Sequence, residues 1–168
     1  MEFEQAKQDF LNLWGTLGSQ WGINRSMAQV HALLMVSPVS LCTEDIMEQL
    51  QISRGNANMT LRDLLSWNLI YKDLKMGERK EFFRAEKDIW EVAKRVTQER
   101  RRREIEPLKE SLRDLQQIDH VAQSAEALEF VKVVKDINKL VNKLDNAAEK
   151  VIKADENWFF GRILNVLK

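Results

Sequence analysis

The sequence predicts a mainly α-helical chain with one small β-hairpin, followed by long helices suited to dimerisation. Three features of its 168 residues lead to this fold class. Apolar residues recur every three or four positions through most of the chain, which is the period of an amphipathic helix. Two β-prone runs, 69–75 and 81–86, flank a short turn that contains Gly77. A sustained 3-4-3-4 apolar pattern near the C-terminus is typical of a coiled coil or a tight bundle.

The first two helices are predicted from their apolar stripes and their stop signals. The first runs from Phe3 to about Gly18, is weakened near its end by Gly15 and is closed by Gly22; its stripe consists of Phe3, Phe10, Leu13, Trp14, Leu17 and Trp21. The second begins near Ser26 and should stop before Pro38, because the residue before a proline disfavours the helical region.

The next segments form a series of helix, turn, helix and hairpin. Thr43 is the predicted N-cap of a third helix, with Glu44 and Asp45 in its first turn, where acids complement the helix dipole. A polar turn leads into a fourth helix, 55–67, whose packing side chains are expected to be Met59, Leu61, Leu64 and Leu65. Two helices joined by so short a turn are typical of a helix-turn-helix. Because the hairpin follows directly, residues 23–90 are predicted to form a winged helix-turn-helix domain.

The remaining segments are predicted to be helical and to build a dimer. Helix 88–118 should be kinked or divided by Pro107. After a polar connection, a final helix carries a seam made of Phe130, Val133, Ile137, Leu140, Leu144, Ala147 and Val151. Such a seam needs a partner, either the preceding helix or a second copy of the chain. We therefore expect 91–168 to be a dimerisation region that is joined by the N-terminal helix, 1–22.

Composition indicates a folded chain in a reducing compartment. Hydrophobic residues make up 44% and charged residues 31%, with few glycines and prolines, so disorder is not expected. The single cysteine, Cys42, excludes an intramolecular disulfide. No cationic leader precedes an apolar run, and no segment approaches the roughly 18 apolar residues of a membrane span. We expect a cytoplasmic protein that has no membrane partner.

The zero net charge conceals a segregation of charge along the chain. Residues 1–50 hold 2 basic and 6 acidic side chains, residues 51–103 hold 14 and 8, and residues 104–168 hold 10 and 12. The middle third is therefore positive although both flanks are negative. A local positive face of this kind can meet phosphate groups even in a chain without net charge.

Two stretches of the sequence resemble a known family. The segment ISRGNANMTLRDLLSWNLI, followed by KMGERKEFFRAEKDIWEVAKRV, is similar to the winged helix of the GbsR-like branch of the MarR family. The N-terminal stretch FLNLWGTLGSQWGINRSMAQVHALLMVSP also resembles that family, so the likeness spans about 3–100. It implies a homodimeric, double-stranded-DNA-binding transcriptional regulator, usually a repressor, for which quaternary amines are among the effectors.

The candidate DNA-binding residues lie on the fourth helix and on the hairpin. The resemblance implies recognition roles for Ser53, Arg54, Asn56, Asn58, Thr60 and Arg62, and wing roles for Arg79 and Lys80. Asparagine can make paired contacts to adenine, and arginine to guanine or phosphate. The alternative is the polar face of an ordinary helix, with Asn56 as a cap. We also expect Glu78 to orient Arg79.

Two further clusters allow two interpretations each. The arginines of 100–103 point in different directions on a helix, so they cannot all face one duplex. They are either solvated or paired with Glu99, Glu104 and Glu106, or they contact DNA directly. The aromatic residues Trp14, Trp21, Trp158 and Phe159 are expected either to form a dimer core or to line an effector pocket. Aromatic rings in such a pocket would attract a quaternary amine by cation–π interaction.

Enzymatic function is not indicated. The two histidines, His31 and His120, lack companion ligands at zinc-binding spacing. No phosphate-binding loop or nucleophile motif occurs, so we expect neither an enzyme nor a cofactor. The rival function is that of a helical dimeric adaptor whose winged helix meets a protein partner; the acidic flanks favour it. DNA binding should weaken steeply with salt, whereas an apolar protein interface should not.

Overall fold

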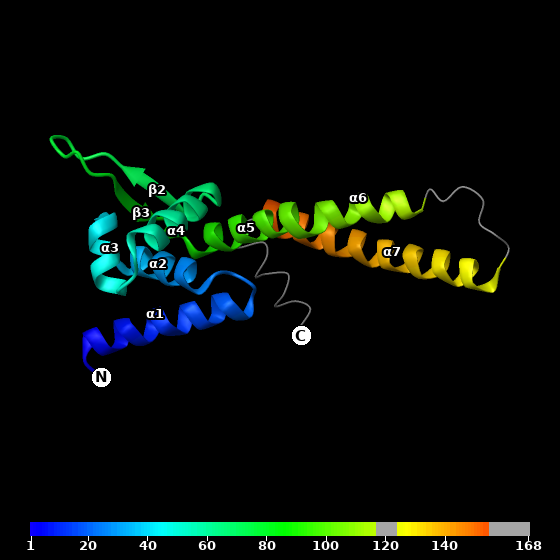
Figure 1. Cartoon of the computed structure of the whole chain (residues 1–168), viewed down its shortest axis with the longest axis horizontal. Coiled ribbons are helices and arrows are strands. Elements are labelled where there is room, and N and C mark those ends of the chain that lie inside the picture. Colours follow the sequence, from blue (N-terminus) through cyan, green and yellow to red (C-terminus); the bar gives the residue numbers. More distant parts are fainter. Residues whose placement is uncertain (117–123, 155–168) are drawn as a thin grey trace. The chain divides into compact units, whose positions relative to one another are not determined.

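The computed structural model describes residues 1–116 and 124–154, and the chain divides into two compact units, Met1–Val92 and Ala93–Lys168. Figure 1 shows the order of the elements. Unit 1 holds α1 (Phe3–Gln20), α2 (Arg25–Val36), β1 (Leu41–Cys42), α3 (Thr43–Leu50), α4 (Arg54–Ser66), β2 (Ile70–Asp73) and β3 (Phe82–Ala85). Then follow α5 (Ile89–Arg100), whose first residues belong to unit 1, η1 (Arg101–Ile105), α6 (Glu106–Leu115) and α7 (Ala125–Lys153). The predicted fold class, mainly helical with a small wing, is confirmed.

Capping side chains fix where the helices of unit 1 begin. The Asn24 side chain accepts hydrogen bonds from the backbone N–H groups of Ser26 and Met27, which starts α2. At α3 the N-cap is Cys42 and not the predicted Thr43, which is already helical. The carboxylate of Asp45 accepts a hydrogen bond from the Cys42 backbone N–H at 2.8 Å. The prediction was wrong by one residue because this hydrogen bond from Cys42 to Asp45 fixes the start of the helix one position earlier.

The glycines of α1 allow close helix packing and do not weaken the helix end. A Cβ atom at Gly15 would lie 2.7 Å from the Gln29 side chain, and one at Gly18 would lie 2.6 Å from the Ala28 Cβ atom. The two helices therefore approach through small residues, and α1 continues to Gln20, beyond the predicted end. Gly22, at φ +75°, then closes the turn as predicted.

Much of the predicted apolar stripe of α1 faces solvent in the single chain. Leu11, Gly15 and Gly18 are the buried residues of this helix. Phe3, Leu13 and Trp21 are exposed, because the small-residue face and not the aromatic face contacts α2.

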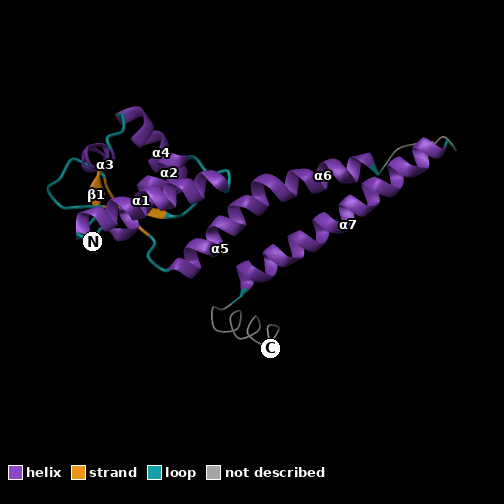
Figure 2. Cartoon of the chain, turned by 90° about the horizontal axis from the view of Figure 1, so that it is seen from below, coloured by secondary structure: helices purple, strands orange, loops and turns teal. Residues whose placement is uncertain are grey.

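The sheet is antiparallel and has the strand order β1-β3-β2. Its strands are coloured orange in Figure 2. The hairpin was predicted, whereas the two-residue strand β1 was too short to be recognised. Pairing of Ile70 with Ala85 and of Leu41 with Phe83 turns these side chains toward the helices, where they are buried. Gly77 takes a φ of +83° in the connecting loop, as the turn required.

The hydrophobic core of unit 1 draws on helices and sheet together. Its largest fully buried apolar side chains are Leu33, Leu34, Ile46, Leu64, Ile70 and Val30. Met59, which the sequence pattern assigned to this core, is 48% exposed, so that assignment was wrong. The stripe of α4 is narrower than the pattern suggested, and Met59 lies on the outer side of the helix.

Unit 2 is an antiparallel helical hairpin, with α6 and α7 side by side in Figures 1 and 2. Pro107 lacks the backbone N–H that would donate a hydrogen bond one turn back. Just before it, the π-helical segment η1 separates α5 from α6, in agreement with the predicted division of this helix. The small core consists of Leu112, Val134 and Val141, with Ile105 packed against it.

The predicted seam of α7 does not pack on the preceding helix. Phe130, Val133, Ile137, Leu140 and Leu144 are between 42% and 57% exposed. The helix thus has two apolar faces, one covered by α6 and one open in the single chain. Within 1–116 and 124–154, no helix is long and apolar enough to cross a membrane.

Candidate nucleic-acid interface

The outer face of α4 presents polar and apolar side chains of the types that read bases. Arg54, Asn58, Met59, Arg62 and Asp63 are all exposed, whereas Ala57, Thr60, Leu61 and Leu64 face the core. The Arg62 Nε atom donates to the Asn58 carbonyl oxygen at 3.4 Å, one turn back. Two of the expected readers, Asn58 and Arg62, therefore lie together at the surface.

Three other expected DNA contacts hold α4 in place. The Ser53 hydroxyl accepts from the Asn56 backbone N–H at 3.3 Å, which caps the helix. The Asn56 side-chain amide donates to the Ser26 hydroxyl of α2 at 3.0 Å, and the Thr60 hydroxyl donates to the Asn56 side-chain oxygen at 3.3 Å. Thr60 is only 2% exposed, so the expectation that its side chain is accessible was wrong. Sequence alone did not indicate this polar chain between α2 and α4.

The wing brings two more of the expected cations to the surface. Arg79 and Lys80 are exposed beside the hairpin turn. Within the described wing, no ion pair joins Glu78 to Arg79. Instead, the acid that reaches the wing is Glu44 of α3, whose carboxylate lies 3.8 Å from the Lys80 Nζ atom and 3.0 Å from the Arg54 guanidinium.

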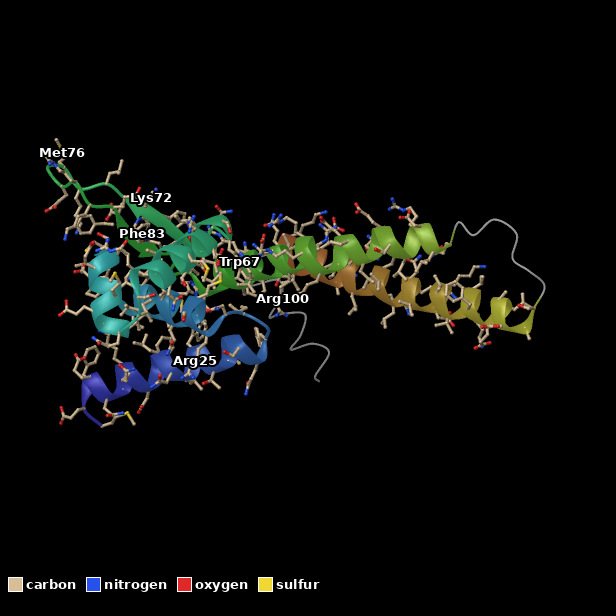
Figure 3. The ribbon with its side chains drawn as sticks, in the orientation of Figure 1. Arg25, Trp67, Lys72, Met76, Phe83 and Arg100 are labelled. Carbon is tan, nitrogen blue, oxygen red and sulfur yellow. The ribbon has the colours of Figure 1, made fainter. Side chains whose placement is uncertain are left out.

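Side-chain contacts stiffen the base of the wing while its tip stays open. Lys72 forms an ion pair with Glu81 at 2.5 Å, and the Lys75 ammonium lies 3.9 Å from the centre of the Phe82 ring. The Arg84 guanidinium lies 4.8 Å from the centre of the Tyr71 ring. At the tip, Met76 is fully exposed (Figure 3), an apolar feature that the sequence reading did not assign to the site.

The arginine run of 100–103 is mostly paired inside unit 2. Arg101 donates to the buried Asp145 carboxylate at 2.5 Å, and Lys109 reaches the same carboxylate at 2.5 Å. Arg102 pairs with Glu99 at 2.6 Å, and Arg103 pairs with the same glutamate. These contacts favour the pairing interpretation over DNA contact for three of the four arginines.

The same contacts keep both buried acids ionised. Hydrogen bonds from Arg101 and then Lys109 lower the pKa of Asp145, although burial opposes the shift. The hydrogen bond from Arg102, followed by that from Arg103, lowers the pKa of Glu99 against the same opposition. Each acid is therefore charged and takes part in ion pairs within unit 2.

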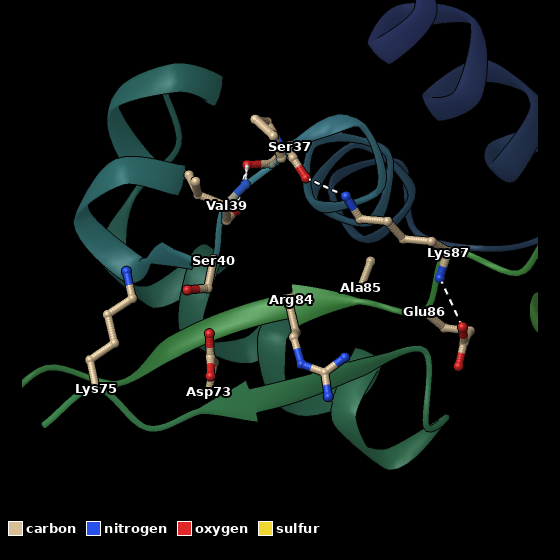
Figure 4. A pocket seen from close by; sticks show the side chains of 10 residues that line it. Ser37, Val39, Ser40, Asp73, Lys75, Arg84, Ala85, Glu86 and Lys87 are labelled. Carbon is tan, nitrogen blue, oxygen red and sulfur yellow. Dashed lines mark hydrogen bonds between the residues drawn. The ribbon is translucent and has the colours of Figure 1, made fainter.

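The expected effector residues are not gathered in the described structure. Trp14 is half-buried beside Phe10, with ring centres 5.7 Å apart, and Trp21, just after the end of the same helix, is 56% exposed. Trp158 and Phe159 lie outside the described residues. A cavity of about 460 Å³ lies elsewhere, between residues 37–40 and the sheet (Figure 4). Lys87 closes one side of it by donating from Nζ to the Ser37 carbonyl oxygen at 2.5 Å.

The described residues do not form a metal centre. No group of three histidine, cysteine, aspartate or glutamate side chains in 1–116 and 124–154 could hold an ion. Cys42 is buried, and desolvation raises the pKa of its thiol. His31 is also buried in unit 1, where desolvation lowers its pKa to about 4.

Comparison with known proteins supports the fold. No protein-family model and no curated protein matches the chain. A crystal structure of a transcriptional regulator matches with a TM-score of 0.66 and 15% sequence identity, over 88% of this chain and 95% of the other. An S. aureus MepR mutant bound to an oligodeoxyribonucleotide matches with a TM-score of 0.41 and 16% identity, over 84% and 91% of the two chains. The first likeness shows that this chain shares the fold of that protein, in agreement with the winged helix-turn-helix arrangement of unit 1.

Proposed function

We propose that the chain is a sequence-specific, DNA-binding transcriptional regulator of the GbsR-like branch of the MarR family, acting as a homodimeric repressor. The observation that carries this proposal is the outer face of α4. Arg54, Asn58 and Arg62 project from a helix that a polar chain and an apolar core hold in place. A helix presented in this way fits the major groove of B-DNA, where such side chains distinguish the base pairs.

The wing supplies the contacts that fix orientation. Arg79 and Lys80 are exposed on a hairpin whose base is held by an ion pair and two cation–π contacts. Cations at such a position bind phosphate oxygens beside the groove and set the register of the reading helix. Ser53, Asn56 and Thr60 contribute by holding α4, so in this proposal they support the contacts to DNA without making them.

The open seam of α7 supports the homodimer. Its exposed residues, Phe130, Val133, Ile137, Leu140 and Leu144, repeat at the spacing with which helices of two chains interlock. Dimerisation would give two α4 helices, which read half-sites about 34–36 Å apart on the same face of DNA. The exposed aromatic face of α1 is a second surface that a partner chain would cover.

A small-molecule effector, with a quaternary amine as the first candidate, completes the proposal. Trp14 and Trp21 could contribute rings to its pocket, together with Trp158 and Phe159. An effector can shift DNA binding only by binding two arrangements of the dimer with different affinities.

A protein-interaction adaptor is the second candidate, and the wing tip favours it. Leu74 and Met76 are both exposed there, and apolar side chains suit a protein surface better than they suit phosphate. Salt dependence separates the two functions, because phosphate contacts release counterions whereas an apolar interface does not.

The test begins with selection of bound fragments from sheared genomic DNA, followed by fluorescence anisotropy at two salt concentrations. Arg62→Ala should weaken binding of the selected fragment by about 1–3 kcal/mol if Arg62 makes a paired contact to a base. Arg113→Ala is the matched control, since it removes an exposed arginine from α6. An inverted repeat with salt-sensitive binding that only Arg62→Ala weakens would support the regulator. Failure to select any fragment, with and without quaternary amines, would favour the adaptor.

A further inference from the structure

One carboxylate lies between the two elements that are proposed to meet DNA. Glu44, in the first turn of α3, is 3.0 Å from Arg54 at the start of α4 and 3.8 Å from Lys80 on the wing. The three side chains remain 42%, 60% and 56% exposed, respectively. Glu44 thus pairs with one cation on the proposed reading helix and with one on the wing.

The position of Glu44 explains why it stays charged and points outward. The neighbouring acid, Asp45, turns back to accept the hydrogen bond from Cys42 and starts the helix. Glu44 also accepts hydrogen bonds at the start of α3, and from there its carboxylate reaches Arg54 of α4 and Lys80 of the wing. The pKa of Glu44 is lowered first by its own backbone N–H and then by hydrogen bonds from Cys42 and Arg54.

We propose that Glu44 is a positioning residue that limits the affinity of this interface for DNA. It holds Arg54 and Lys80 in the DNA-free chain, and a DNA phosphate has to compete with it for both cations. This inference rests on the proposed DNA-binding function and concerns the regulation of the same surface.

The chemistry of the three groups gives the direction of the effect. A carboxylate beside an incoming phosphate repels it, and the cations that Glu44 engages are less available to neutralise phosphate. Because Glu44 contacts neither Asn58 nor Arg62 in the described residues, removing its charge should strengthen binding to all sequences alike. Base preference should remain as it is.

The magnitude is modest, so the experiment needs a matched control. Exposed ion pairs are weak, which corresponds to an expected gain in affinity of about three-fold for Glu44→Gln at moderate salt. Glu48→Gln removes the same charge one turn further along α3, from an exposed residue that forms no ion pair within the described chain. We expect it to change affinity by less than about 1.5-fold, the effect of net charge alone.

Fluorescence anisotropy on the selected operator and on unrelated DNA would measure both variants over a series of salt concentrations. In a chain that already carries Arg54→Gln and Lys80→Gln, the gain from Glu44→Gln should fall to the effect of net charge alone, that of Glu48→Gln, because no cation is left to release. Equal effects of Glu44→Gln and Glu48→Gln in the otherwise unchanged chain, or the full gain persisting in that double variant, would overturn the inference. A changed base preference would instead make Glu44 a direct reader, which also overturns it.

A second measurement is independent of DNA. In an NMR titration of the free protein, Arg54→Gln should raise the pKa of the Glu44 carboxyl group, and an unchanged value would overturn the pairing. The two hypotheses can fail separately. Salt-sensitive binding by the wild type with no response to Glu44→Gln rejects the inference and leaves the regulator in place, whereas no binding by the wild type rejects the proposed function and with it the role of Glu44.

Discussion

The two units of the chain are held together by different interactions. Unit 1 buries large apolar side chains from helices and sheet, among them Leu33, Ile46, Leu64 and Ile70. The described part of unit 2 buries a small apolar cluster of Leu112, Val134 and Val141, and beside it two charged residues, Glu99 and Asp145. Unit 1 therefore has an extensive core of its own, whereas the described hairpin of unit 2 leaves an apolar seam uncovered.

Ion pairs accompany the small core of unit 2 and connect its helices. Arg101 and Lys109 converge on Asp145 from η1 and α6, so this carboxylate joins both to α7. A buried ion pair adds little net stability, but removing one member leaves the other uncompensated. The network therefore specifies which residues of the hairpin face each other more than it adds to the free energy of unfolding.

The largest effect is expected from two adjacent residues of α7. Val141→Asp would bury a carboxylate among Leu112 and Val134, and should destabilise the hairpin by about 4 kcal/mol or more. Leu140→Asp alters a residue that is 57% exposed, so it should leave the hairpin helical and break the proposed dimer. Circular dichroism and sedimentation measure the two properties. A dimer that survives Leu140→Asp would remove the seam from the interface.

A smaller loss of folding stability, caused by mild acid, should distinguish the two units. His31 is buried in unit 1, its pKa is lowered to about 4, and its Nε2 atom has no hydrogen-bond partner among the described residues. The unfolded chain takes up this proton below about pH 6.5, so stability is full above that pH and falls on acidification until the folded state also protonates near 4. The loss should be about 2 kcal/mol between pH 7.5 and pH 5.

Urea unfolding followed through the amide signals of α2 and α7 would test this difference. The lowered pKa of Asp145 means that its contribution to unit 2 is present above the usual aspartate range and is lost only in stronger acid. Unit 1 should therefore weaken first. His31→Leu should flatten the pH dependence of unit 1, and a variant that keeps the full dependence would show that another group is responsible.

The smallest effect concerns DNA binding through the exposed Met59 of α4, the proposed reading helix. If its side chain packs on a thymine methyl group, replacing that thymine with deoxyuridine should weaken binding by about 0.8 kcal/mol. Met59→Ala should lose the same amount on the thymine operator and become insensitive to the replacement. Anisotropy titrations of both proteins on both DNAs complete the cycle. Equal sensitivity in the two proteins would mean that Met59 does not contact that methyl group.

Periodicity predicted the elements of the fold better than it predicted their faces. The helices and the hairpin follow from apolar spacing, Gly77, Pro107 and the capping residues, which act locally. Met59 and Thr60 are neighbours at the edge of the apolar stripe of α4, where a change of less than half a turn exchanges the buried and exposed residues. Thr60 faces inward, where its hydroxyl donates to Asn56, whose side-chain amide donates in turn to the Ser26 hydroxyl of α2.

The sequence indicated the cations of the candidate site but not the acids that pair with cations. Arg54, Arg62, Arg79 and Lys80 are marked by their residue types and by the motif. Glu44 is distant from Lys80 in the sequence, and their pairing depends on how the wing folds over α3. The same holds for Asp145, whose role emerges only when α7 returns beside η1.

Hydrogen bonds join Ser26, Asn56 and Thr60, so the residues of α4 fall into an inward set and an outward set. The inward set holds α4 against α2, so substitutions there would loosen the packing of the two helices. The outward set, which contains Asn58, Met59 and Arg62, is exposed and does not hold α4 to α2. Under the proposed function, new operator preferences would therefore come from exchanging the outward residues alone, with the packing of α4 against α2 left unchanged.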